Sequence, residues 1–159
     1  MKADYINPFL TALASAFDTM LGCSVTRTDL TLKSSNVPTF DVSGIIGLSG
    51  KAMGTVVLSV SKNVAVKATS VMLMVSEEDV TDEEIVDAIG ELANMVAGAA
   101  KSTLEQYELS VSLPTVISGT PHAISFPSNV SPICVRYESD WGPLTLEVGM
   151  TSVPAAVAS

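Results

Sequence analysis

Apolar residues recur every three or four positions between Thr81 and Gln106, which predicts one long amphipathic helix. Thr81 is placed to cap the N-terminus, and Glu84 three residues later completes a capping box. At about 1.5 Å per residue, the helix would be roughly 37 Å long. Its apolar face comprises Ile85, Ile89, Leu92, Val96, Ala100 and Leu104, with Val86 and Ala93 alongside.

The opposite face of this predicted helix carries a polar stripe at steps of three and four residues. Glu91 and Asn94 lie three residues apart in it, so their side chains are neighbours on one surface. Asn is a poor helix former, and the residues nearby, Gly90, Ala97 and Gly98, are small, which favours close approach by another molecule. An ordinary solvated face is the alternative. The stripe consists of Glu84, Asp87, Glu91, Asn94, Gly98 and Lys101.

Two more helices and several strands are predicted around the long helix. A first helix is capped by Asn7, has Pro8 at its first position and ends at Gly22. A second begins after Ser61 and has apolar residues as far as Val75. Alternating apolar residues predict strands at Ser24–Leu32, Phe40–Leu48, Val56–Val60, Leu109–Leu113, Ile133–Tyr137 and Leu144–Met150, with a loop over Ile117–Pro132 and a turn at Ser139–Gly142.

The order of these elements is helix, three strands, two helices and three or four strands. Strands that are adjacent in sequence favour antiparallel pairing. We therefore predict an α+β fold, with a mainly antiparallel sheet and a pair of long helices packed on one face. Residues 1–153 are expected to form a single domain, and residues 154–159 a flexible tail.

Composition narrows the classes of partner. The chain of 159 residues has 17 Asp and Glu against 8 Lys and Arg, a net charge of −9, so a nucleic-acid partner is not expected. The acidic surface favours a partner with exposed Lys or Arg, or serves solubility alone. Mean hydropathy is +0.43, yet no apolar run approaches the roughly 18 residues of a membrane span. We expect no membrane insertion and a cytoplasmic protein.

Few residue types suited to catalysis or metal binding are present. Cys23 and Cys134 lack metal-ligand spacing and are expected to be buried free thiols. A single histidine, His122, argues against a Ser-His-Asp triad or a multi-histidine metal site. The glycines of GLSGKAMG are not followed by the Lys-Ser/Thr of a phosphate loop. No metal site and no cofactor of the chain's own are predicted.

Several segments together resemble the CheC/CheX/FliY family of chemotaxis phosphatases, and within it the CheX members most closely. The segments are an INPF start to the first helix, the glycine-lysine hairpin, EEIVDAIGELANMVAGAAKSTL and the SLPTVISG that follows it. The Glu-x-x-Asn tetrapeptide is unspecific alone, but its position just ahead of SLPTVISG is more specific. The resemblance covers nearly the whole domain.

The resemblance implies a fold and a reaction. Family members dephosphorylate the phosphoaspartate of CheY-like receiver domains. By resemblance, Asn94 would hold a water in line with the phosphoryl group, and Glu91 would pair with the receiver's active-site lysine. Mg²⁺ would belong to the receiver, and a homodimer through sheet edges is implied. The first helix lacks a Glu-x-x-Asn motif, so one site per chain is expected.

Other residues of the stripe are candidates for contact with the receiver, namely Glu84, Asp87, Gly98 and Lys101. For the two carboxylates, favourable interaction with the helix dipole is an equal alternative. Three rival functions remain: a non-catalytic receiver-binding adaptor, a structural dimer, and a metal-dependent hydrolase that uses Glu84, Asp87 and Glu91.

Overall fold

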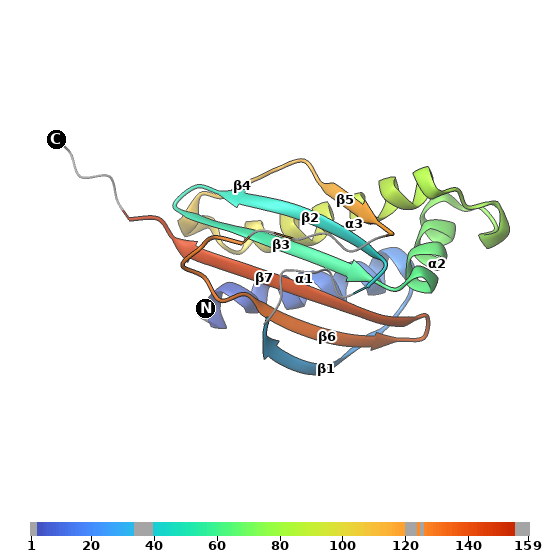
Figure 1. The fold of residues 1–159 in the computed structure, drawn as a ribbon, viewed down its shortest axis with the longest axis horizontal. Helices are drawn as coiled ribbons and strands as arrows, with labels where there is room; N and C mark the ends of the chain where they lie inside the picture. Colours follow the sequence, from blue (N-terminus) through green and yellow to red (C-terminus); the bar gives the residue numbers. More distant parts are fainter. Residues whose placement is uncertain (1–2, 34–39, 120–123, 125, 155–159) are drawn as a thin grey trace.

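A single antiparallel sheet with helices along one face makes up the protein (Figure 1). The computed structural model describes residues 3–33, 40–119, 124 and 126–154. Within them, seven strands form the sheet in the order β1-β6-β7-β3-β2-β4, and β5 also pairs with β2. Every strand pairing is antiparallel. The predicted α+β fold with helices on one face is confirmed.

The elements follow the predicted order along the chain. Two long helices and one shorter helix are joined by strands and by two short 3₁₀ turns. Their bounds are α1 Ala3–Leu21, β1 Val25–Leu32, β2 Val42–Ser49, β3 Ala52–Val60, α2 Lys62–Leu73, η1 Glu77–Asp79, α3 Asp82–Ser102, η2 Glu105–Tyr107, β4 Ser110–Val111, β5 Thr115–Ser118, β6 Ile133–Ser139 and β7 Gly142–Ser152.

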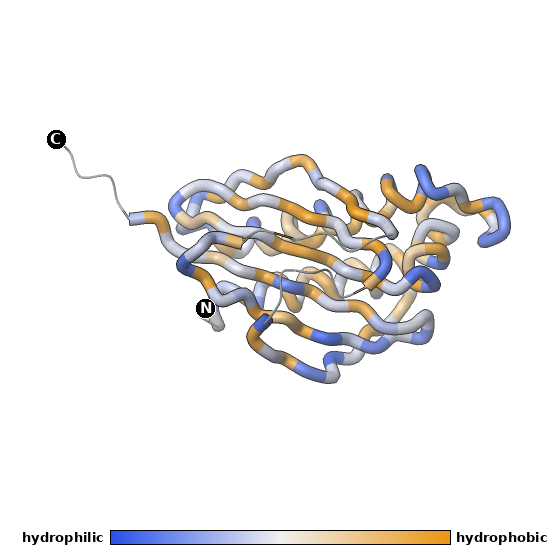
Figure 2. The backbone as a smooth tube through the Cα atoms, in the orientation of Figure 1, coloured by the Kyte–Doolittle hydropathy of each residue, from blue (hydrophilic) through white to orange (hydrophobic). Residues whose placement is uncertain are grey.

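The hydrophobic core lies between the sheet and the two long helices. Phe9, Leu13 and Phe17 of α1 are fully buried, as are Ile89 and Leu92 of α3. Figure 2 shows hydrophobic positions along the central strands and hydrophilic positions at many of the turns. The predicted apolar residues of α3 are buried except Val86, which is 37% exposed. The helix ends at Ser102 rather than at Gln106 as predicted, so the buried Leu104 lies beyond it. Burial of the apolar face fixes the rotation of α3, and hence the direction of its polar stripe.

A glycine in β2 sets the distance between α3 and the sheet. A Cβ atom on Gly44 would lie 2.9 Å from the Cβ of Ala93 and 3.2 Å from the carbonyl oxygen of Ile89. Contacts this short force a neighbour to move. Gly44 together with the small Ala93 therefore lets the middle of α3 pack directly on β2.

The first helix begins at Ala3, one turn earlier than predicted, so the expected cap at Asn7 is wrong. Pro8 lies inside the helix, where its missing N–H removes one hydrogen bond. The extra turn buries Tyr5 and Ile6. The Tyr5 hydroxyl is 2.6 Å from Ser152 Oγ, and the ring packs edge-on against Tyr107. These contacts with distant segments outweigh the local signal for a helix start.

The strand predicted at Leu109–Leu113 is shorter than expected, and strand β5 extends into the start of the loop predicted from Ile117. Both short strands lie along the same edge of β2. Val111 pairs with Leu48, and Thr115 pairs with Ile45. The segment from β4 to β5 therefore advances four residues while β2 advances three. One extra residue of this kind is a β-bulge, which displaces the intervening residues from the ladder.

The face of the sheet away from α1 and α3 holds a buried ion pair that the sequence did not predict. Lys33 Nζ lies 2.6 Å from Glu147 Oε1, with side-chain exposures of 7% and 0%. Glu147 alternates along β7 with the core residues Leu146 and Val148, so it points to the other face. Breaking a buried pair usually costs about 3–5 kcal/mol, because one charge is left without its partner.

Some predictions concern residues that the structure does not describe. His122 and residues 155–159 of the expected tail lie outside the described residues. The second helix ends at Leu73, so Val75 lies beyond it. Among the described residues, no helix combines the length and the apolar character needed to cross a bilayer.

Candidate functional site

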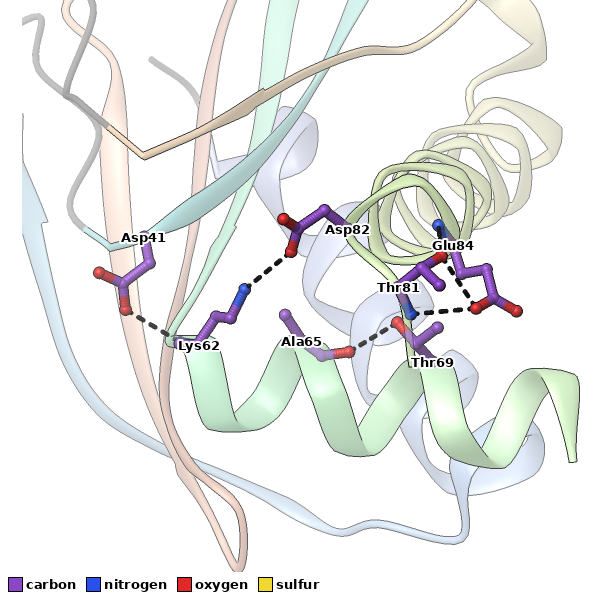
Figure 3. A network of polar contacts seen from close by, with 7 residues as sticks. All are labelled: Asp41, Lys62, Ala65, Thr69, Thr81, Asp82 and Glu84. Carbon is purple, nitrogen blue, oxygen red and sulfur yellow. Dashed lines mark hydrogen bonds and ion pairs between the residues drawn. The ribbon is translucent and has the colours of Figure 1, made fainter. Parts of the chain in front are cut away.

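Both ends of α3 are fixed by hydrogen bonds, which makes it a rigid support for its polar stripe. At the N-terminus, the backbone N–H of Thr81 donates to Glu84 Oε1 at 3.0 Å, and the N–H of Glu84 donates to Thr81 Oγ1 at 3.2 Å (Figure 3). The predicted capping box is confirmed. At the C-terminus, the Thr103 hydroxyl donates to the carbonyl of Ala100 at 2.9 Å. An N-cap such as that of Thr81 contributes about 0.5–2 kcal/mol.

A lysine at the start of α2 links α3 to the start of β2. The backbone N–H of Lys62 donates to Asp41 Oδ2 at 2.9 Å, and its ammonium lies 3.4 Å from Asp82 Oδ1 (Figure 3). The ion pair is exposed, so it contributes at most about 1 kcal/mol. The backbone contact, however, holds the starts of α2 and β2 together, beside the capped end of α3.

Glu91 and Asn94 lie side by side on the face of α3 that is directed away from the core. Glu91 is exposed and Asn94 is partly exposed, whereas Leu92 and Ala93 between them are buried. Neither polar side chain forms a hydrogen bond or ion pair with another part of the described chain. A carboxylate and a carboxamide are thus presented together and have no partner within the described structure.

The three small residues near Asn94 have different roles. Ala97 is fully buried in the core, and Gly90 lies beneath β5 and the residue before it, because a Cβ there would be 3.3–3.4 Å from Val116 and Pro114. A Cβ on Gly98 would meet nothing within 4 Å. The interpretation that all three leave Asn94 open to another molecule is therefore wrong for Gly90 and Ala97 and holds only at Gly98.

Hollows flank the Glu91–Asn94 pair toward either end of α3. One, of about 540 Å³, lies toward the C-terminus, and the other, of about 460 Å³, lies toward the N-terminus. The candidate contact residues Gly98 and Lys101 line the first, and Asp87 lines the second. The first is completed by Ser102, Glu105, Glu108, Leu109 and Val111, and the second by Asp82, Glu83, Val86 and Ser118.

The structure gives Glu84, the fourth candidate contact residue, a role of its own. One of its carboxylate oxygens accepts hydrogen bonds from both the backbone N–H and the hydroxyl of Thr81, at 3.0 and 2.9 Å. Glu84 therefore stabilises the start of α3, where a negative charge also interacts favourably with the helix dipole. Its direct contact with a partner stays a prediction.

No metal-binding cluster is found in the described part of the chain, where no three His, Cys, Asp or Glu side chains come together suitably. In particular, Glu84, Asp87 and Glu91 are not brought together as a ligand set. Burial raises the pKa of the Cys23 thiol, and burial together with the nearby Glu147 carboxylate raises that of Cys134. Both cysteines are free thiols, Cys23 buried and Cys134 half-buried, and neither is set up as a thiolate nucleophile.

Sequence reasoning did not single out Leu113, which lies in the bulge between β4 and β5 with its side chain 89% exposed. The available signal was the adjacent Pro114, which marks an interruption or an edge of a strand. Alternation alone placed Leu113 on the apolar side of a strand. The extra residue of the bulge removes it from that side.

Comparison with known proteins gives consistent matches. The model of the family described as chemotaxis phosphatase CheX matches residues 42–138. The CheY-P phosphatase CheX of Thermotoga maritima is 38% identical over 77 residues, which is 47% of this chain. The match spans only half the length of that curated relative.

Solved structures extend the likeness to nearly the whole chain. A CheC-like superfamily protein from Shewanella sp. PV-4 has a TM-score of 0.84 at 32% identity, covering 96% of this chain and 100% of its own. A chemotaxis protein CheX from Desulfovibrio desulfuricans has a TM-score of 0.82 at 28% identity, covering 93% and 99%.

Proposed function

Because the chain belongs to the CheX family of chemotaxis phosphatases, we propose that it hydrolyses the phosphoaspartate of a CheY-like receiver domain. One observation carries the proposal: Glu91 and Asn94 stand together on a capped helix, outside the core and without partners in the described structure. The similarity to a CheY-P phosphatase supports the same class of substrate.

Asn94 orients the attacking water. A carboxamide both donates and accepts hydrogen bonds, so it can hold a water molecule in one orientation. Because it is neutral, it does not repel the phosphoryl oxygens as a carboxylate would. Phosphoryl transfer depends mainly on positioning and on stabilising charge rather than on covalent work by the protein. A side chain on a rigid helix supplies the required positioning.

Glu91 fixes the docked pose of the receiver by pairing with its active-site lysine. A hydrogen bond between two charged groups is shorter and stronger than one between neutral groups. The net charge of −9 adds a favourable long-range field toward a basic partner. Since Glu91 lies one turn before Asn94, its ion pair would set where the carboxamide meets the phosphoryl group.

The proposal assigns Mg²⁺ to the receiver rather than to this chain. There it would neutralise phosphoryl charge, while Glu91 and Asn94 provide binding and orientation. We also propose a homodimer through sheet edges and a cytoplasmic location, both implied by the resemblance to CheX members. Within the described residues, β1 pairs only with β6, so one of its edges is available for such a contact.

Phosphate release from a charged receiver tests the proposal. A CheY-like receiver is phosphorylated with acetyl phosphate and Mg²⁺, the phosphodonor is removed, and dephosphorylation is followed with and without this protein. We expect the protein to accelerate the reaction catalytically, with many turnovers per chain. Saturable binding without acceleration would instead identify an adaptor, and the phosphatase proposal would be rejected.

Two substitutions at Gly98 have different expected effects: a small one should raise stability, and a bulky one should lower activity. Gly98→Ala should raise the free energy of unfolding by about 0.5–1 kcal/mol, because glycine is unfavourable within a helix and the site is open. Gly98→Leu should lower kcat/KM about tenfold or more, since a bulky group one turn after Asn94 would clash with the docked receiver. Urea unfolding and the dephosphorylation assay measure the two effects.

The adjacent exposed residue Ala99 provides the matched control for Gly98. Ala99→Leu adds the same bulk at a position rotated about 100° around the helix, off the polar stripe. Its kcat/KM should stay within about twofold of the unmodified protein. Equal losses for Ala99→Leu and Gly98→Leu would contradict a receiver that approaches along the stripe.

A further inference from the structure

An exposed leucine beside the proposed site has no explanation within the fold. Leu113 is 89% exposed and lies in the bulge where the chain leaves β4 and rejoins the edge of β2 as β5. Bulges often redirect a side chain and are common next to active sites. Without the extra residue, the alternation of the strand would not place an apolar side chain in solvent here.

The backbone around Leu113 is held in place on both sides. Ser112 donates its N–H to the carbonyl of Gly47 at 2.9 Å, and its hydroxyl oxygen accepts the Gly47 N–H at 2.8 Å. The Ser112 hydroxyl also donates to the carbonyl of Leu113 at 2.9 Å. On the other side, Pro114 packs against α3 at Gly90. An exposed leucine on a fixed backbone loses little conformational freedom on binding, which favours association.

The position of Leu113 links it to the proposed site. Pro114 contacts the helix at Gly90, the residue directly before Glu91. Leu113 directly precedes Pro114, and Glu91 directly follows Gly90, so each lies one residue from that contact. Consecutive Cα atoms are only about 3.8 Å apart. A protein interface of standard size covers about 800 Å² per partner. A receiver centred on Glu91 and Asn94 would therefore also reach Leu113.

We infer that Leu113 is an apolar docking residue for the phosphorylated receiver, burying its side chain beside the phosphorylation site while Glu91 and Asn94 engage the reacting groups. The inference rests on the proposed function and adds a hydrophobic contact to a surface that is otherwise acidic. Apolar side chains that become buried on binding contribute affinity, whereas exposed charges mainly steer the approach.

A second copy of the chain is a less suitable occupant. The bulge lies on the edge of the sheet formed by β4 and β5, opposite the edge formed by β1 (Figure 1). A copy seated over Leu113 would crowd the adjacent surface at Glu91 and Asn94, and so would compete with the receiver. We therefore assign Leu113 to the receiver and treat self-association there as an outcome of the test.

The test compares Leu113→Ser with Leu73→Ser, a matched change at a 44% exposed leucine at the end of α2. We expect Leu113→Ser to raise KM for the phosphorylated receiver about tenfold, to leave kcat within about twofold, and to leave the urea midpoint unchanged. Leu73→Ser should change neither kinetic constant, and Leu113→Met should keep KM near that of the unmodified protein. An unchanged KM for Leu113→Ser would overturn the inference.

Two further measurements distinguish failure of the docking inference from failure of the phosphatase proposal. Sedimentation of Leu113→Ser should show the same oligomeric state as the unmodified protein, and dissociation into smaller species would assign Leu113 to self-association instead. Titration of Asn94→Ala with the phosphorylated receiver, with and without Leu113→Ser, measures docking apart from catalysis. Docking that depends on Leu113 without turnover in the unmodified protein would reject the phosphatase proposal and keep the docking residue. If neither docking that depends on Leu113 nor turnover is observed, both the docking inference and the phosphatase proposal are rejected.

Discussion

Asn94→Ala is expected to remove the acceleration of receiver dephosphorylation, lowering kcat by about 100-fold or more. Losing one positioned hydrogen-bonding group usually costs about 10²–10³ in rate. The fold should be retained, since Asn94 lies on the partly exposed face of α3 and forms no hydrogen bond within the described structure. Single-turnover measurement at saturating chain concentration reports the chemical step directly, and KM should change little.

Two variants control the Asn94 result. Asn7→Ala removes an exposed carboxamide from α1 and should leave kcat unchanged. Asn94→Asp keeps the size of the side chain but places a negative charge near the phosphoryl oxygens, so it should be as inactive as Asn94→Ala. Full activity in Asn94→Ala would show that another group orients the water, and the proposed mechanism would fail.

Glu91→Ala is expected to weaken docking more than chemistry, raising KM by at least about 30-fold. Removing one member of an interfacial charge pair costs about 2–5 kcal/mol, because the other charge is left without its partner. Since Glu91 is exposed in the free protein, the stability of the fold should change little. The initial rate over a range of receiver concentrations gives KM and kcat separately.

Glu78→Ala is the matched control for Glu91, because it removes the same charge from η1, outside α3. It should change KM by less than about threefold at physiological salt, through the long-range field alone. Added salt should raise KM for the unmodified protein more than for Glu91→Ala. Equal losses in Glu78→Ala and Glu91→Ala would indicate general acidity rather than a specific pair.

Local patterns made the long helix and its stripe predictable. The apolar spacing from Ile85 to Ala100 and the capping box of Thr81 and Glu84 depend on residues three or four apart. Such contacts form within the helix and need no information about the rest of the fold. The Glu91–Asn94 pair was found for the same reason, because its neighbours on the surface are also its neighbours in the sequence. Its catalytic role stays a prediction.

The roles of single residues around that pair depended on segments far away in the sequence. The sequence does not distinguish Gly90 from Gly98. In the structure, Pro114 and Val116 pack against Gly90, whereas nothing lies within 4 Å of a Cβ atom placed on Gly98. Likewise, Leu113 lies on the apolar side of the predicted strand, and only its bulged pairing with β2 places it in solvent. The spacing of residues in the sequence does not show which distant segment of the chain covers a given position.

By itself, the sequence determined the α+β class, from the order of its elements, and the amphipathic helix with its carboxylate-carboxamide pair, from periodicity within one segment. Only the tertiary structure decided where α1 begins, which glycine faces open space, and that Lys33 and Glu147 meet in a buried pair. Each of these depends on contacts between residues far apart in the chain, such as Tyr5 with Ser152. Burial energy at such contacts exceeds the local preferences that a sequence pattern records.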